Sequence, residues 1–166
     1  MAEPEPRDVR IQRPNREKAA SRATKATVIV LLLLSAGLVL AVTIGGWTRL
    51  AGMQPVEIAY MLVYVVMAYY VARWNRGVLP LAAALAIPLA IFAAIAGPEW
   101  LDRDQQGFSG PALPPGLVGL ITLLIVPVQV LLIAFALRGF RQEWNVEVEV
   151  PAGQAYEPGI HRPRTA

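Results

Sequence analysis

The residues of this chain that could do chemistry are few, and they lie beside or inside long apolar runs. Arg49 and Glu57 stand between the first two runs, in the stretch VTIGGWTRLAGMQPVEIAY. Gln129 is the most polar residue near the centre of a run, and Tyr60 and Tyr64 are four residues apart, so they share a helix face. These side chains could form an ion pair, line a small polar cavity or hydrogen-bond between helices.

Arg49 and Glu57 have a structural interpretation. The stem of an arginine near a membrane boundary can lie along apolar surface while its guanidinium stays at the interface. Glu57 opens the next apolar run, where the positive end of a helix dipole favours a carboxylate. We therefore expect an Arg49–Glu57 pair that closes the hairpin between the first two runs. A buried functional charge is the alternative.

A second polar group lies in the segment PEWLDRDQQGFSGPALPP, where Glu99, Asp102 and Asp104 surround Arg103. Carboxylates bind hard cations, but a calcium loop needs more oxygen ligands in a fixed order, and Arg103 opposes a cation. The chain has no cysteine and one histidine, His161. Thiolate, iron–sulfur and multi-histidine sites within one chain are therefore not expected. We predict no catalytic group, no cofactor and no metal.

One segment resembles part of a known family. GGWTRLAG, from Gly45 to Gly52, is similar to the segment that follows the first span in the haem A synthase family. The resemblance covers eight of the 166 residues. That family ligates haem through membrane histidines, and no span or outer loop here has one. Haem A synthesis by this chain alone is therefore not predicted, and Arg49 is the one residue to which a role in that family could be carried over.

The elements that position these residues are four apolar runs. The chain is 55% hydrophobic and 16% charged, whereas soluble domains carry about 25% charged residues. A run of 18 or more apolar residues is long enough to cross the hydrocarbon layer as a helix, and helices satisfy their own backbone groups there. We predict an all-α, four-helix transmembrane bundle with spans at about 26–46, 55–72, 78–97 and 115–137.

The basic residues predict an orientation. Most of them precede the first span, lie in the RWNRG connection or follow the fourth span, whereas the other two connections hold only Arg49 and Arg103. Connections rich in Lys and Arg stay in the cytoplasm. We therefore expect a multi-pass protein with both termini cytoplasmic. The composition, rich in Ala, Arg and Pro, favours a GC-rich bacterium, so the membrane would be the plasma membrane.

The two ends of the chain differ from the spans. Residues 1–25 are charged and contain three prolines, so we predict a disordered basic tail. Residues 26–141 form the transmembrane domain, and 142–166 form a cytoplasmic C-terminal tail. Within that tail, NVEVEVP alternates apolar and acidic residues as a half-buried strand does. A lone strand is unstable, so it is either an extended exit segment or a strand that pairs with a partner.

Small residues at four-residue spacing mark expected packing faces, because they let helix backbones approach closely in lipid. They could pack the bundle internally or present one face to a partner subunit. The set comprises Gly37, Ala41 and Gly45 in the first span, and Ala82, Ala86, Ala90 and Ala94 in the third.

The sequence leaves three functions open. The first is a non-catalytic accessory or assembly subunit of a membrane complex, whose partners would be the lipid bilayer, other membrane subunits or further copies of itself, and not nucleic acid. The second is a small oligomeric transporter or channel, motivated by Pro88, Pro127 and Gln129 within spans. The third is a membrane enzyme with an outer-face site built from Arg49, Glu57 and the loop acids. We favour the first.

Overall fold

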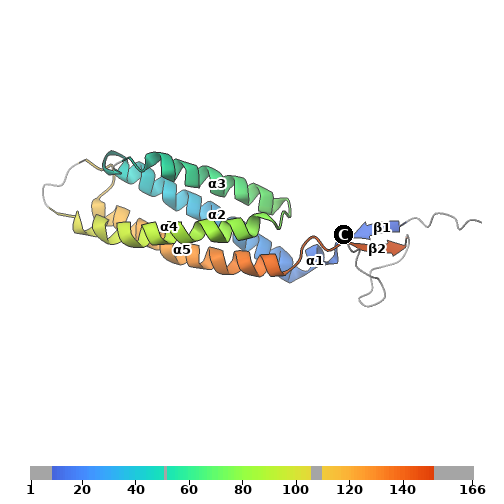
Figure 1. Ribbon diagram of the computed structural model, residues 1–166. Helices are drawn as coiled ribbons and strands as arrows, with labels where there is room; N and C mark the ends of the chain where they lie inside the picture. Colours follow the sequence, from blue (N-terminus) through green and yellow to red (C-terminus); the bar gives the residue numbers. More distant parts are fainter. Residues whose placement is uncertain (1–8, 51, 106–109, 152–166) are drawn as a thin grey trace, which may run out of the picture.

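The structure, a computed structural model, describes residues 9–50, 52–105 and 110–151 (Figure 1). It is mostly helical, as predicted. The elements in chain order are β1 (Val9–Gln12), α1 (Pro14–Glu17), α2 (Ala19–Gly46), the 3₁₀ turn η1 (Trp47–Arg49), α3 (Gln54–Ala72), α4 (Val78–Asp102), α5 (Pro115–Arg141) and β2 (Val148–Pro151).

Four helices, α2 to α5, are long and apolar enough to cross a membrane. They contain the four predicted spans, and three of them extend beyond the prediction by more than one residue. Helix α2 starts seven residues earlier, at Ala19, while α4 continues to Asp102 and α5 to Arg141. These extensions are polar or charged turns, which hydropathy alone assigns to loops. Helices α4 and α5 run continuously through Pro88 and Pro127, so neither is a broken helix.

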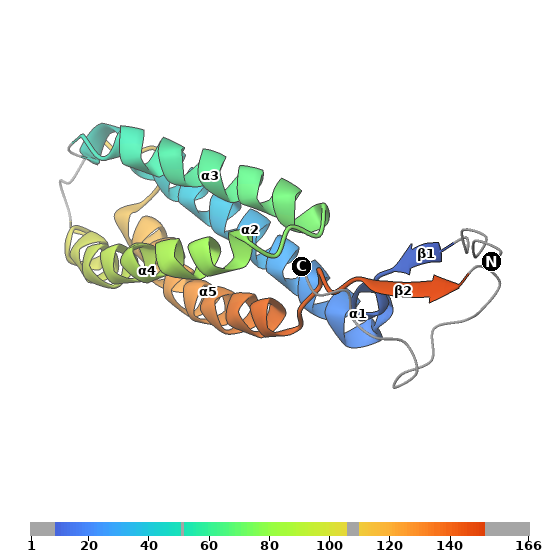
Figure 2. The same ribbon diagram turned by 45° about the vertical axis from the view of Figure 1, so that its right-hand side comes forward.

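The bundle is held together unevenly. Helix α4 packs most extensively against α5, and α2 packs against both α3 and α5, but α3 and α4 make few contacts with each other (Figure 2). The core draws buried residues from all four helices, with Leu32 of α2, Tyr64 of α3, Leu79 of α4 and Leu132 of α5 fully buried. The sparse α3–α4 contact means that this edge of the bundle is its least closed side.

The bundle has two distinct ends. The loop end carries η1 and the connection from α4 to α5, and the terminal end carries the connection from α3 to α4 together with α1, β1 and β2 (Figure 1). The two strands pair antiparallel, with Gln12 opposite Val148 and Arg10 opposite Val150. The start and the end of the described chain therefore meet at the terminal end.

This pairing corrects the prediction of disordered tails for the residues nearest the bundle. Residues 9–25 are not a flexible segment, since they contain β1, α1 and the first turns of α2. The alternating segment near Val148 is a strand, and its partner is β1 of the same chain. Composition misjudged residues 9–25 because their order depends on contacts with residues more than 120 positions away. The predicted tail residues 1–8 and 152–166, with His161, lie outside the described residues.

Each predicted row of small residues, in α2 and in α4, is buried at one end and exposed at the other. In α4, Ala82 and Ala86 are buried, Ala90 is half-buried and Ala94 is exposed. A helix has 3.6 residues per turn, so each four-residue step turns about 40° around its axis. The row from Gly37 through Ala41 to Gly45 drifts likewise. Gly37 is exposed with open space around it, Ala41 is half-buried, and Gly45 is buried against Leu113.

A close approach of α4 and α5 uses two glycines that the four-residue rows do not include. A Cβ built at Gly119 of α5 would lie 3.0 Å from the Gly97 carbonyl oxygen and 2.9 Å from Leu101 Cδ2 of α4. A Cβ at Gly97 would lie 2.6 Å from Leu123 Cδ2. These positions need glycine because backbone and side chains of the facing helix occupy the space. This contact joins α4 to α5 near the loop end.

Substitution of Gly119 tests this close approach. Gly119→Ala should lower the free energy of unfolding by about 1–3 kcal/mol, because the added methyl meets a backbone oxygen that cannot move independently. Gly37→Ala is the matched control, since its methyl meets nothing within 4 Å. Thermal unfolding in detergent measures both. Equal melting temperatures for the two variants would contradict the proposed packing.

Candidate outer pocket and polar network

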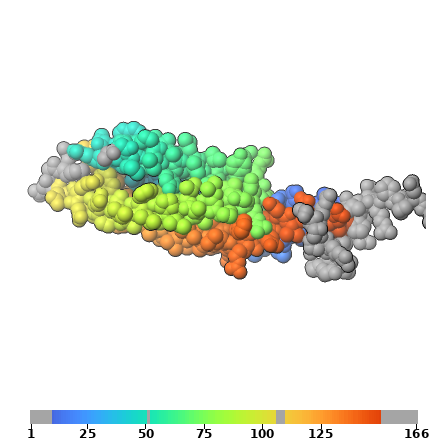
Figure 3. All heavy atoms as spheres, viewed as in Figure 1, coloured from blue at the N-terminus to red at the C-terminus, as the bar shows by residue number. Residues whose placement is uncertain are grey.

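A pocket of about 270 Å³ lies at the loop end, between α3 and α4. It occupies the side where these helices make few contacts, and Figure 3 shows this face with α3 in teal and α4 in yellow-green. Its floor consists of buried residues from α2 and α5, namely Val39, Val42, Thr122 and Ile125. Its rim includes the exposed side chains of Val56 and Phe92. The pocket is therefore open sideways, toward the surface that would face lipid.

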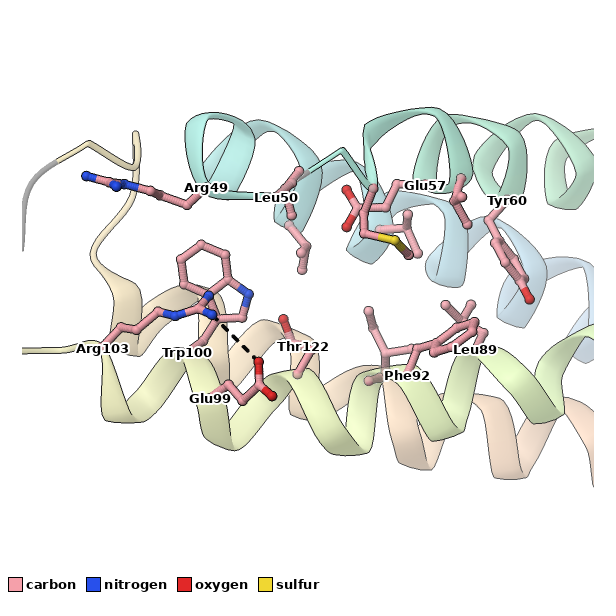
Figure 4. Close-up of a pocket in the computed structure, with 17 residues that line it drawn as sticks. Arg49, Leu50, Glu57, Tyr60, Leu89, Phe92, Glu99, Trp100, Arg103 and Thr122 are labelled. Carbon is pink, nitrogen blue, oxygen red and sulfur yellow. Dashed lines mark ion pairs between the residues drawn. The ribbon is translucent and has the colours of Figure 1, made fainter.

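The pocket walls are apolar apart from a few groups near the loop end. Leu50, Met53, Leu89 and Ala93 line it together with Tyr60, which projects from α3 one turn beyond Glu57 (Figure 4). The polar and charged lining residues are Arg49, Glu57, Glu99, Arg103 and Thr122. Such a site suits an occupant with an apolar body and a polar end.

Glu57 is the central polar group of the pocket. It lies in the first turn of α3, where the helix dipole favours a carboxylate, and its side chain points into the space between α3 and α4 (Figure 4). Its Oε2 atom is buried and has no hydrogen-bond partner within the described part of the chain. Buried polar atoms are nearly always partnered. The Thr43 side chain of α2 lies within hydrogen-bonding reach of this carboxyl group, and Oε2 remains open to a donor from an occupant.

The predicted Arg49–Glu57 pair is not found. Arg49 extends away from Glu57, as Figure 4 shows, and its guanidinium lies beside the α4–α5 connection. A Cβ built at Gly110 would lie only 2.9 Å from Arg49 Nε. Next to Arg49, the hydroxyl of Thr48 donates to the Gly110 carbonyl at 2.5 Å. Both residues hold η1 against this connection, so Arg49 links two connections and does not close the α2–α3 hairpin.

The α4 side of the pocket mouth is built around Trp100. This indole is buried. It fits because Gly46 has no side chain, since a Cβ built at Gly46 would lie only 2.8 Å from Trp100 Cζ2. The guanidinium of Arg103 lies 5.2 Å from the Trp100 ring centroid and 3.6 Å from Glu99 Oε2. Arg103 and Glu99 are both well exposed, so this ion pair contributes little to stability. Arg103 is therefore a cation at the pocket mouth that can exchange partners.

The loop acids do not form a metal site. Glu99 lines the pocket, whereas Asp102 does not, and Asp104 lies against Gly116 in the first turn of α5. There its carboxylate faces the positive end of the α5 dipole. In the portion of the chain that the structure describes, no group of three or more His, Cys, Asp or Glu side chains could hold a metal ion.

Gln129 lies outside the pocket, in a fully buried network. Its Oε1 accepts a hydrogen bond from the Tyr64 hydroxyl at 3.0 Å, and its Nε2 donates to Ser35 Oγ at 2.9 Å. Ser35 in turn donates to the Leu31 carbonyl at 2.7 Å. Tyr60 contacts this network through its ring, which meets that of Tyr64 edge to face at 5.8 Å. Of the three residues predicted to share a cavity, only Tyr60 lines the pocket.

The terminal end holds a second set of polar contacts, here called the terminal clamp. Arg13 pairs with Glu147 at 2.5 Å, and Arg16 Nε donates to the Trp144 carbonyl at 2.9 Å. Trp144 is fully buried and meets Trp74 edge to face at 5.3 Å. Burial lowers the pKa of the Arg16 guanidinium, and the nearby Arg13 charge adds to this effect. Arg16 remains a cation because arginine is not deprotonated in proteins.

Sequence reasoning missed the clamp because it assigned the N-terminal basic residues to topology alone. One signal was present, since VRIQ at 9–12 alternates apolar and polar residues as NVEVEVP does. Gly97 and Gly119 were missed because the four-residue rows chosen did not include them. Trp100 gave no sequence signal for burial, since tryptophan at a span end is typical of an interface anchor.

Comparisons with protein-family models, with curated proteins and with solved structures find no match for this chain. The site must therefore be interpreted from its own geometry.

The buried network makes a prediction about stability. Gln129→Leu should lower the free energy of unfolding by about 1 kcal/mol, because Tyr64 loses its acceptor while remaining buried. In a Tyr64→Phe background the same substitution should cost less, since the orphaned hydroxyl is gone. A double-mutant cycle in detergent measures this coupling. Strict additivity of the two effects would show that the hydrogen bond contributes nothing.

Proposed function

We propose that this chain is a non-catalytic multi-pass protein of a bacterial plasma membrane, with both termini in the cytoplasm, that serves as an accessory or assembly subunit of a larger membrane complex. The observation that carries the proposal is the terminal clamp. It gathers residues 9–16 and 144–151 into one folded unit outside the helical bundle, where a partner subunit can contact it.

The two-stranded sheet supports this role. A sheet of two strands is only marginally stable by itself, and edge strands offer backbone groups to a further strand. Over the described residues, β1 and β2 each have one strand neighbour. The addition of a partner strand would extend this sheet by a known mode of recognition. The clamp contacts from Arg13 and Arg16 hold the sheet next to the bundle, so a partner docked there would also be held at the membrane.

The polar network argues against a transport role. A transport path needs polar groups that face a cavity, whereas Gln129 and Tyr64 are fully buried and use each other as partners. The pocket does not include either residue. Continuous α4 and α5 also lack the unwound segment by which broken helices expose carbonyls to a substrate.

The orientation can be tested with single cysteines, because the chain has none of its own. Ala112→Cys places a thiol at the loop end, and Gly77→Cys places one at the terminal end. In intact cells, a membrane-impermeant maleimide should label the Ala112→Cys protein only. Gly77→Cys should react once the membrane is permeabilised. The opposite pattern would reverse the proposed orientation.

The subunit role predicts a partner at fixed stoichiometry. Tagged chain purified in mild detergent from its native membranes should carry one membrane protein at a constant molar ratio, and a tag on that protein should recover this chain. Arg13→Glu should weaken the recovery because it places two carboxylates together in the clamp. The double variant Arg13→Glu/Glu147→Arg should restore it. Recovery of the chain alone, as a monomer or homo-oligomer, would contradict the proposal.

A further inference from the structure

We propose that the outer pocket binds one amine-bearing phospholipid, with its phosphoethanolamine head across the pocket mouth and an acyl chain between α3 and α4. This inference goes beyond the proposed subunit role and does not depend on it. It stands on the pocket geometry, on the unpartnered oxygen of Glu57 and on the cation at the facing helix.

The shape of the pocket fits part of a lipid. Its volume of about 270 Å³ is just below the usual range for small-molecule sites, roughly 300–1,000 Å³. It therefore suits a head group with the first carbons of a chain, and the remainder of the chain can lie along the surface of α3 and α4. Because the pocket is open between these two helices, a lipid could enter sideways without crossing an aqueous passage.

The walls select an apolar occupant below the mouth. Leu89 and Phe92 lie on the side away from the loop end, with the Tyr60 ring opposite them on α3 (Figure 4), and Ile125 also lines the pocket. Water in such a space would find few polar partners, and a buried water needs two to four of them. A hydrocarbon chain needs none and gains contact with every wall.

Glu57 selects the head group. Its buried Oε2 lacks a donor among the described residues, and Figure 4 shows the carboxylate directed into the pocket. A carboxylate away from water is costly unless a cation or strong donor meets it. A primary ammonium supplies both the charge and three N–H donors. A trimethylated amine supplies charge without a donor, and a glycerol head supplies hydroxyl donors without charge.

Arg103 completes the head-group site from α4. It lies on the opposite side of the mouth from Glu57, where Trp100 and Glu99 hold its guanidinium (Figure 4). A lipid phosphate can displace Glu99, because their exposed pair is weak and an arginine binds phosphate oxygens in a bidentate fashion. The ammonium would thus meet α3 and the phosphate would meet α4. The occupant bridges the two helices that make the fewest contacts with each other.

Lipid competition tests the proposal. Purified full-length protein is exchanged into detergent with phosphatidylethanolamine, phosphatidylcholine and phosphatidylglycerol of identical chains, and bound lipid is counted by native mass spectrometry. We expect about a tenfold preference for phosphatidylethanolamine. Glu57→Gln should remove most of that preference, because a charged hydrogen bond is worth about 1.4 kcal/mol more than a neutral one. Arg103→Gln should weaken the binding of all three lipids, because each carries a phosphate, and should leave the preference for phosphatidylethanolamine in place.

Two further variants keep the test decisive. Glu17→Gln, at the terminal end and exposed, is the matched control and should keep the preference. Ala96→Leu places a larger side chain in the pocket and should lower the binding of all three lipids. Thermal unfolding identifies any variant that has lost its fold. Equal binding of the three lipids would overturn the proposal, and so would a phosphatidylethanolamine preference that survives in folded Glu57→Gln.

Discussion

The buried hydrogen bonds of Gln129 are the interaction on which the arrangement of this bundle depends. In an apolar medium a glutamine must find its partners inside the protein. Here the side-chain amide of Gln129, in α5, bonds both Ser35 of α2 and Tyr64 of α3. Three helices are thereby fixed to one another at a single level. The described part of α4 has no polar link of this kind, and its attachment rests on close contact with α5 at Gly97 and Gly119 and on buried alanines. Because α3 packs mainly against α2 and α4 mainly against α5, the two helices stand apart over much of their length and make few contacts with each other.

That separation creates the outer pocket. Buried residues of α2 and α5 form its floor, and Leu50 and Trp100 line it at the loop end. Glu57 then lies over an apolar space, with an oxygen that lacks a donor within the described structure. A carboxylate so placed costs free energy in the empty pocket, and that cost would be recovered when a cationic occupant arrives. An occupant there would stabilise the least closed side of the molecule.

The terminal clamp orders the chain segments on either side of the helical bundle in the sequence. The segments β1, α1 and β2 lie outside the four long apolar helices, yet they are ordered against the end of the bundle. Trp144 supplies the buried anchor, and the Arg13 and Arg16 contacts fix the direction in which the chain leaves α5. The clamp and the outer pocket lie at opposite ends, so a partner at one and a lipid at the other would not compete.

The sequence by itself determined the four long apolar helices and their approximate limits. These features depend on local hydrogen bonds and on run length, which any stretch of about 20 apolar residues displays.

Only the tertiary structure decided which polar groups meet. Tyr64 and Gln129 are 65 positions apart, and β1 and β2 are separated by the entire bundle. Arg49 lies eight residues from Glu57 and was expected to pair with it, but the packing of η1 against the loop after α4 turns its guanidinium away. The small-residue rows failed in part for a geometric reason, since a four-residue repeat drifts around a helix of 3.6 residues per turn. The real close contact, at Gly97 and Gly119, depends on how α4 and α5 meet, and neither helix specifies that alone.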